Sequence, residues 1–267
     1  MMIDETALKE VWNKEVIRGR AANGQLPFFE VWEEIGSTND RAAVLAKGGA
    51  PDFCLVTADK QTAGKGRRGR VWESPAGSSL SMSLILRPRV PLDTLSQLTI
   101  LGGVAVKRCL KKAGTAPRIK WPNDIRLMDR KVCGILAETA LSGNCAAYTI
   151  LGIGINIRRA AYAEDVAPLA ISLEEAGAAV SREELMAKIS REMMDLTAKW
   201  EQAGDLSFIR DEYEASMEWK GEICRVISAD GSFTEGKVLG INTDGTLRFL
   251  TNEGEKAVGA GEVSLRR

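Results

Sequence analysis

The sequence predicts an α+β fold in which a mixed β-sheet with packed helices is followed by a small all-β barrel. Up to residue 217, strand-like and helix-like stretches follow one another along the chain. After Trp219, short alternating runs are separated by the turns Asp230-Gly231, Asp244-Gly245 and Asn252-Glu253-Gly254, as expected of hairpins. We therefore expect an N-terminal helical extension over residues 1–27, a main domain over residues 28–218 and the barrel over residues 219–267.

Composition limits the class of protein. The chain has 267 residues, of which 45% are hydrophobic and 27% charged, as in ordinary globular proteins. No apolar run is long enough to span a bilayer, and the acidic start of the chain lacks the apolar core of a secretion signal. The 36 basic and 36 acidic side chains cancel, so no overall charge attracts nucleic acid or membranes. We expect a cytoplasmic protein that binds neither DNA nor membranes.

The spacing of the cysteines and the absence of histidine exclude several kinds of chemistry. The five cysteines are scattered without C-x-x-C spacing, which fits neither a disulfide framework nor a zinc site. Histidine is absent. Mechanisms that need a histidine base, nucleophile or metal ligand are therefore excluded, and catalysis by positioning and by fixed positive charge is favoured.

The first elements follow from periodicity and capping residues. Residues from about 5 to 20 are predicted to form a helix, and residues 28–35 a strand. Short side-chain oxygens in Ser37-Thr38-Asn39-Asp40 can cap a helix that ends at Gly48-Gly49. Residues 53–57 then form a strand.

The remaining elements of the main domain surround a polar loop. Residues 61–72 are polar and rich in glycine, which indicates a loop between strands, where sites are often found. Apolar residues recur at helical spacing before Lys111-Lys112. The expected strands are 79–86, 118–121, 131–138 and 148–157, with turns at Pro122-Asn123 and Ser142-Gly143-Asn144, and the expected helices are 95–112, 182–202 and 206–217.

The loop contains four cations in seven residues, Gly64-Lys65-Gly66-Arg67-Arg68-Gly69-Arg70. Glycines let the backbone curl around a ligand, and guanidinium groups bind carboxylate or phosphate with two hydrogen bonds. The spacing differs from that of a P-loop. The motif predicts a bound anion, and a solvated basic loop or nucleic-acid patch is the alternative.

Three other motifs are candidates for binding. Ser37-Thr38-Asn39 either caps a helix or presents its N-terminus to a polar ligand. Lys131 opens an apolar strand, so it needs an anionic partner unless it is simply exposed, and Gly134 leaves room beside it. In Gly152-Ile153-Gly154-Ile155-Asn156, alternation places both glycines on one face, which suits either a flat ligand or close packing in a sheet.

Taken in order, these motifs resemble those of the biotin–protein ligase family from about Phe28 to Arg267. The matching segments are residues 64–70, 120–124, 131–138, 152–156 and the terminal Gly261-Glu-Val-Ser-Leu-Arg266. The resemblance implies the ligase catalytic fold and an SH3-like C-terminal barrel. This sequence differs from the family at Lys65, where arginine is usual; lysine keeps the charge but lacks the planar guanidinium group. We expect a short form without the additional N-terminal DNA-binding domain that some members carry, since fewer than 30 residues precede the first matching strand.

The resemblance also implies roles for individual residues. The expected catalytic residues are Arg67, Lys131 and Asp124. The expected biotin-binding residues are Ser37, Thr38, Asn39, Gln61, Lys65, Gly66, Arg67, Lys131 and Gly134. The expected residues for ATP or the adenylate are Arg67, Arg68, Arg70, Trp72, Asn123, Asp124, Lys131, Asn156 and Arg266. Mg²⁺ is expected with ATP, and its ligands stay unassigned.

The implied activity is formation of biotinyl-5'-AMP and transfer of biotin to a lysine of a biotin carboxyl carrier protein, by a monomer or a homodimer. A lipoate–protein ligase or octanoyl transferase is the nearest alternative, although their arginine and histidine motifs are not seen. A biotin-sensing DNA-binding repressor and an independently binding C-terminal barrel are further alternatives. Neutral charge, the short N-terminus and the Arg266 motif oppose them.

Overall fold

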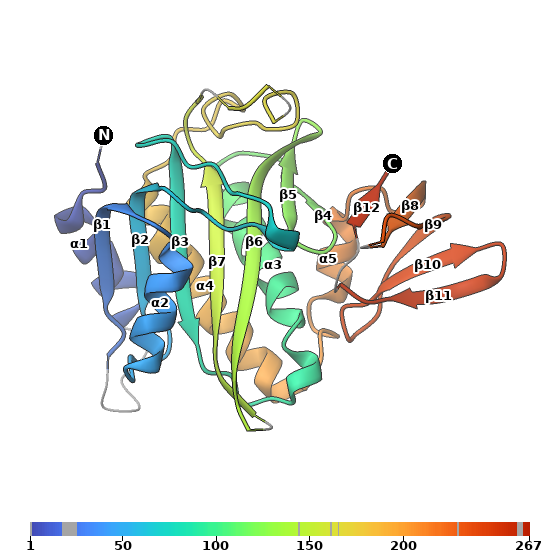
Figure 1. The fold of residues 1–267 in the computed structure, drawn as a ribbon, viewed down its shortest axis with the longest axis horizontal. Helices are drawn as coiled ribbons and strands as arrows, with labels where there is room; N and C mark the ends of the chain where they lie inside the picture. The colour runs from blue at the N-terminus through green and yellow to red at the C-terminus, as the bar shows by residue number, and fades with distance from the viewer. Residues whose placement is uncertain are drawn as a thin grey trace.

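The computed structural model of this chain describes residues 2–17, 26–143, 145–160, 162–164, 166–228, 230–260 and 264–267. Its main sheet is formed by β1 (Phe29–Ile35), β2 (Leu55–Gln61), β3 (Ser79–Leu86), β4 (Arg118–Lys120), β5 (Asp124–Leu127), β6 (Arg130–Ser142) and β7 (Cys145–Asn156). In the described residues, the strand order is β1-β2-β3-β7-β6-β5-β4 (Figure 1). Only β1 and β2 pair in parallel there, so the predicted mixed sheet is confirmed.

Strand alternation divides the buried residues of this sheet between two faces. Leu55, Leu84 and Leu151 belong to the large hydrophobic core. Their neighbours Val56, Ile85 and Ile150 belong to a smaller cluster that packs against α2 (Thr38–Lys47). Because successive side chains of a strand point to opposite faces, α2 covers one face and the large core lies on the other.

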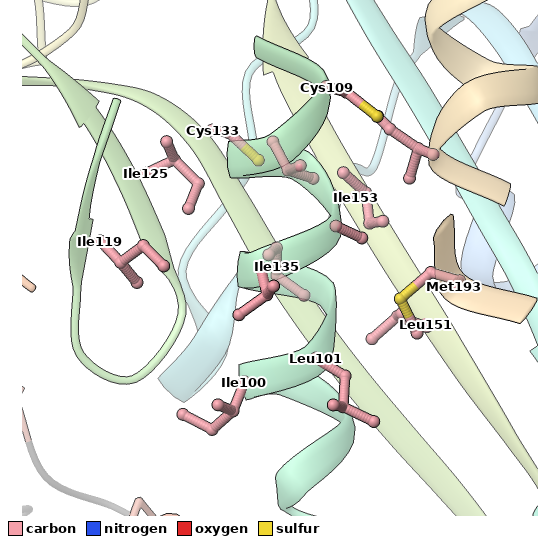
Figure 2. Packing of buried hydrophobic residues seen from close by; sticks show 14 of the residues in the cluster. Ile100, Leu101, Cys109, Ile119, Ile125, Cys133, Ile135, Leu151, Ile153 and Met193 are labelled. Carbon is pink, nitrogen blue, oxygen red and sulfur yellow. The ribbon is translucent and has the colours of Figure 1, made fainter. Parts of the chain in front are cut away.

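The large core lies between the sheet and two long helices, α3 (Gln97–Lys112) and α4 (Arg182–Ala203). Figure 2 shows side chains of β6 and β7, including Ile135 and Ile153, beside α3. Gly102 allows this close approach, because a Cβ there would lie 3.3 Å from the Ile135 side chain. The helices thus hold β6 and β7 from one side and leave the other side to ligands.

The N-terminal helix α1 (Glu5–Glu15) is shorter than predicted. The Asp4 side chain caps it by accepting from the N–H groups of Thr6 and Ala7. Buried Leu8 and Trp12 join the main core, so the helix packs onto the fold. The end predicted near Arg20 lies outside the described residues.

The C-terminal part contains β8 (Ile223–Ile227), β9 (Phe233–Ile241), β10 (Leu247–Thr251), β11 (Gly254–Val258) and β12 (Ser264–Arg266). In the described part of the chain they form one antiparallel sheet in the order β11-β10-β9-β8-β12, and no pairing there closes it into a barrel. This confirms the predicted fold class of a mixed sheet followed by a small antiparallel domain. The boundary near residue 218 stays a prediction.

The strands predicted at residues 131–138 and 148–157 are longer in the structure, as β6 and β7, and two further details of the predicted strands were wrong. The strand expected at residues 53–57 begins at Leu55, because Phe53 adopts a left-handed conformation with φ of 63°. The short strand β5 was missed, since only four residues separate the Pro122-Asn123 turn from a second turn. That second turn has positive φ at Met128 and Asp129. Together these features give the sheet its β4–β5–β6 end.

A short helix, α5 (Arg210–Ser216), precedes the C-terminal sheet and agrees with the later part of the helix predicted at residues 206–217. After it, the Glu218 N–H donates to the carbonyl of Ile119 at 2.8 Å. The Trp121 indole N–H donates to the carbonyl of Gly245 at 3.1 Å. The end of β4 is thus hydrogen-bonded to the C-terminal domain. None of the helices described is long and apolar enough to cross a membrane.

We expect Asp59→Ala to lower the free energy of unfolding by about 3–5 kcal/mol, because it removes the carboxylate that compensates the charge of a buried arginine. Asp59 and Arg182 are 5% and 8% exposed, and they form an ion pair of 2.7 Å. Urea unfolding measures the change. Glu34→Ala is the matched control, because it breaks the neighbouring exposed pair with Lys60 and should have little effect. Equal effects of the two variants would contradict the structural role of the buried pair.

Candidate active site

Two adjoining cavities lie at the α2 face of the main sheet. The narrow cavity is lined by the start of α2, the basic loop and the glycines of β6 and β7. The larger cavity has a volume of about 400 Å³ and extends from the basic loop to β4, β5 and the C-terminal residues. Five residues line both: Gly66, Arg67, Trp72, Asn123 and Lys131. A reacting group from each cavity could meet at this shared wall.

Trp72 forms the wall between the cavities because glycines leave space for its ring. Gly134 and Gly154 face each other in the β6–β7 pairing. A Cβ at Gly154 would lie 2.3 Å from the indole of Trp72, and one at Gly134 would lie 3.0 Å from it. The glycine face was predicted to suit either a flat ligand or close packing in the sheet. In this structure the Trp72 side chain of the protein itself occupies it.

The N-terminus of α2 points into the narrow cavity, although its predicted cap is wrong. The Ser37 side chain makes no capping hydrogen bond. Instead, the Gln61 side-chain oxygen accepts from the Thr38 N–H at 2.9 Å and from its hydroxyl at 3.0 Å. The buried Ser37 hydroxyl has no partner in the described residues. A buried hydroxyl of this kind suits a polar ligand group.

Asn39 and Lys65 connect the basic loop to both walls of the narrow cavity. Asn39 donates to Glu138 of β6 at 2.6 Å and accepts from the Ser83 hydroxyl at 2.6 Å. Lys65 pairs with Asp40 of α2 and lies 3.8 Å from Glu138. The hydrogen bond to Asp40 raises the pKa of Lys65. The positive charge of Lys65 thus holds the basic loop against α2 and β6.

Arg67 stands at the junction of the two cavities. Its guanidinium donates to the Asn123 side chain at 2.9 Å and to the carbonyl of Ala260. Burial lowers the pKa of Arg67, and repulsion from Arg70 and Arg68 adds to this effect, while Asp124 opposes it. A guanidinium remains charged under these conditions. The site therefore holds a fixed positive charge that is partly removed from water.

The sequence predicted an unspecified anionic partner for Lys131, and the structure shows an ion pair with Asp124 at 2.7 Å. Its ammonium also lies 5.4 Å from the ring centre of Trp72. Burial opposes ionisation of Asp124, but Lys131 and Lys120 outweigh it and lower the pKa of this carboxyl. Asp124 therefore stays ionised, which makes it a poor proton acceptor and a good partner for cations.

Lys120, Arg126 and Trp219 form a second group in the larger cavity. The Lys120 ammonium and the Arg126 guanidinium lie 5.3 and 5.4 Å from the Trp219 ring centre. Burial lowers the pKa of Lys120 to about 8, with further lowering by Arg266, Arg126 and Lys131 and opposition from Asp124. This part of the cavity is strongly positive.

The structure brings the expected residues together as two groups. All nine expected biotin-binding residues line the narrow cavity, and all nine expected nucleotide-binding residues line the larger one. Asn156 is mainly occupied with the main chain, since its amide donates to the carbonyl of Ile171 at 3.2 Å. Arg266 reaches the larger cavity from β12, while Gly261, Glu262 and Val263 of its motif lie outside the described residues. The binding roles stay predictions.

Other lining residues were not predicted. Ser81 and Met82 on β3 carry no motif of their own, and the segment with Tyr162, Val166 and Leu169 has no periodic pattern. Lys120 belongs to a motif that was recognised, but it was given no role. Nothing in the sequence around Trp219 indicated that it would lie beside Lys120 and Arg126.

Family models match both parts of the chain. The model of the biotin/lipoate A/B protein ligase family matches residues 35–156, and that of the biotin protein ligase C-terminal domain matches residues 221–266. The solved structure of a biotin protein ligase from Aquifex aeolicus in complex with biotin and ATP is 30% identical, with a TM-score of 0.77 over 90% of this chain and 98% of that one.

Sequence relatives agree with this result. The bifunctional ligase/repressor BirA of Bacillus subtilis is 36% identical over 86% of this chain and 72% of its own length. The biotin–acetyl-CoA-carboxylase ligase of Paracoccus denitrificans is 35% identical over 85% of this chain and 96% of its own length. The chain belongs to the biotin protein ligase family, which confirms the resemblance seen in its motifs.

We expect Gly154→Ala to displace Trp72, since the added methyl would overlap its indole. The cost of such overpacking, about 1–3 kcal/mol, should appear as at least a several-fold loss of biotin affinity in calorimetric titration. Gly103→Ala on α3 is the control, because its nearest neighbour would lie at an ordinary 3.7 Å. Unchanged biotin affinity in Gly154→Ala would show that the position of Trp72 does not matter for the narrow cavity.

Proposed function

We propose that this chain is an ATP-dependent biotin–protein ligase that forms biotinyl-5'-AMP and transfers biotin to a lysine of a biotin carboxyl carrier protein. The observation that carries the proposal is the pair of cavities that share Arg67 and Lys131. One cavity is narrow and lined by uncharged polar groups at its inner end, and the other is large and cationic. Two anionic substrates could meet there beside fixed positive charge.

In the first step, the biotin carboxylate attacks the α-phosphorus of ATP, and the bond to the β-phosphate oxygen breaks to release pyrophosphate. We assign the biotin side to Ser37, Thr38, Asn39, Gln61, Lys65, Gly66 and Gly134. Arg67 and Lys131 lie at the shared wall, where they lower the repulsion between carboxylate and phosphate. Holding both substrates in adjoining cavities adds the rate gain of proximity.

The nucleotide side is assigned to Arg68, Arg70, Trp72, Asn123, Asp124, Asn156 and Arg266, with the shared Arg67 and Lys131. Mg²⁺ would arrive with ATP as part of the substrate. The described residues contain no group of three or more acidic or cysteine ligands that could hold a metal ion. Where Mg²⁺ binds together with a nucleotide, phosphate oxygens and water commonly supply most of its ligands.

In the second step, the carrier lysine attacks the biotinyl carbonyl as a neutral amine and AMP leaves. Asp124 would orient the incoming amine, since it stays ionised beside Lys131. We further propose that the enzyme works in the cytoplasm as a monomer or homodimer. All five cysteines are unpaired, in keeping with a reducing compartment.

Titration of the protein with biotin and with lipoate, each with ATP and Mg²⁺, tests the substrate class. We expect micromolar or tighter binding of biotin and a biotinyl-AMP product in mass spectrometry. The named relatives and the matched C-terminal domain support biotin. Preference for lipoate, or binding without adenylate formation, would refute the proposal.

Arg67→Ala should weaken retention of biotinyl-AMP by roughly tenfold or more, because it removes charge-assisted hydrogen bonds at the junction. Release of reactive adenylate can be followed by its hydrolysis or by nonspecific labelling of added protein. Arg191→Ala is the control, since Arg191 pairs with Asp195 on α4, away from both cavities. An adenylate affinity equal to that of the unmodified protein would remove Arg67 from the site.

A further inference from the structure

We propose that Lys120 is a further catalytic residue, whose ammonium binds the β- and γ-phosphates of ATP and stabilises pyrophosphate as it leaves. The inference rests on the proposed ligase function. Lys120 is the first residue of the Lys120-Trp121-Pro122-Asn123-Asp124 segment. It would contact the β- and γ-phosphates of ATP, which the adenylate does not keep.

Lys120 is a buried cation without a carboxylate partner. It is 7% exposed and sits in β4, where it pairs along the backbone with Asp124. Within the described ranges, no side chain or carbonyl forms a hydrogen bond or ion pair with its ammonium. The ammonium lies 5.3 Å from the ring centre of Trp219. A buried ammonium is costly unless an anion compensates it.

Two neighbouring cations of the cavity already have acidic partners. Lys131 pairs with Asp124 at 2.7 Å, and Arg126 pairs with Glu218 at 2.8 Å. Asp124 lies close enough to influence Lys120, but its ion pair is with Lys131. In contrast to Lys131 and Arg126, Lys120 therefore keeps a charge that is available to a ligand.

The position of Lys120 indicates which part of ATP it contacts. Arg67 and Lys131 line both cavities and so mark the place where carboxylate and α-phosphate meet. Lys120 lines only the larger cavity, on the part of its wall with Arg126 and Arg266. Another part of that wall is apolar, with Val166, Leu169 and Ala170, and suits a nucleobase. The cationic part suits the phosphates beyond the α-position.

The chemistry needs no proton transfer from Lys120. As the carboxylate oxygen bonds to the α-phosphorus, the bond from that phosphorus to the bridging oxygen breaks and its electron pair stays on pyrophosphate. A protonated lysine near the β-phosphate stabilises this growing charge, and burial strengthens the interaction. A bound phosphate would also favour the ammonium form, against the lowering of the pKa of Lys120 by burial.

Trp219 is the positioning residue for Lys120. It adopts a left-handed backbone conformation with φ of 62°, which is uncommon for a bulky side chain. Its ring lies within cation–π distance of both Lys120 and Arg126. The start of the C-terminal domain thus fixes the direction of a cation that belongs to the main sheet.

The test compares Lys120→Met with the unmodified protein in pyrophosphate release and in binding of separately prepared biotinyl-AMP. We expect the KM for ATP to rise, and inhibition by added pyrophosphate to weaken, by roughly 10- to 100-fold, as for loss of a charged hydrogen bond. Affinity for biotinyl-AMP should stay unchanged, because the adenylate lacks these phosphates. Lys120→Arg should recover part of the loss.

Lys107→Met is the matched control, since Lys107 is also 7% exposed but pairs with Glu212 away from the cavity. Its kinetics should equal those of the unmodified protein. An unchanged KM for ATP in Lys120→Met, or an equal loss of ATP and biotinyl-AMP affinity, would overturn the role of Lys120. Absence of adenylate formation by the unmodified protein would instead overturn the ligase function.

Discussion

Close contact between the Trp72 ring and the glycines of β6 and β7 is the constraint on which both cavities depend. Gly134 and Gly154 oppose each other across the two strands. A side chain at Gly154 would overlap the indole, and one at Gly134 would press against both the indole and Lys131. With the ring lying flat, it separates the narrow cavity from the larger one while Arg67 and Lys131 reach both. The sheet is held from its other face by α3, so the glycine surface cannot retreat from the ring.

Charge in the larger cavity is arranged differently from charge elsewhere in the protein. Over the whole sequence the acidic and basic residues balance. Around this cavity, cations from the basic loop, β4, β5, β6 and β12 outnumber the lining carboxylates Glu73 and Asp124. Mutual repulsion lowers the pKa of Lys120 and of Arg67 in addition to burial. A polyanion such as ATP relieves that repulsion. Part of the binding free energy therefore comes from removing the electrostatic repulsion that is present in the ligand-free protein.

Sequence patterns predicted those helices and strands that are determined by the residues within them. The strand at residues 79–86 has the predicted bounds, because apolar residues alternate with small serines there and turn residues flank the segment. The family resemblance predicted which residues share a site. Composition alone could not distinguish an anion-binding loop at residues 64–70 from a solvated basic loop. What failed depends on tertiary contacts: Gln61 replaces the Ser37 cap, and Phe53 takes positive φ. The approach of Trp219 to Lys120 joins residues far apart in sequence, which no local pattern encodes.

The attachment of the C-terminal sheet to β4 links ligand occupancy to domain cohesion. Trp121 is hydrogen-bonded to Gly245, and Trp219 lies against Lys120 and Arg126, so the same short segment faces the cavity and its neighbouring domain. A ligand that touches both sides binds only when the domains are together. By thermodynamic linkage, nucleotide must then increase the free energy needed to separate them. Local opening at this joint, and the proteolytic susceptibility that follows from it, would vary with the supply of ATP.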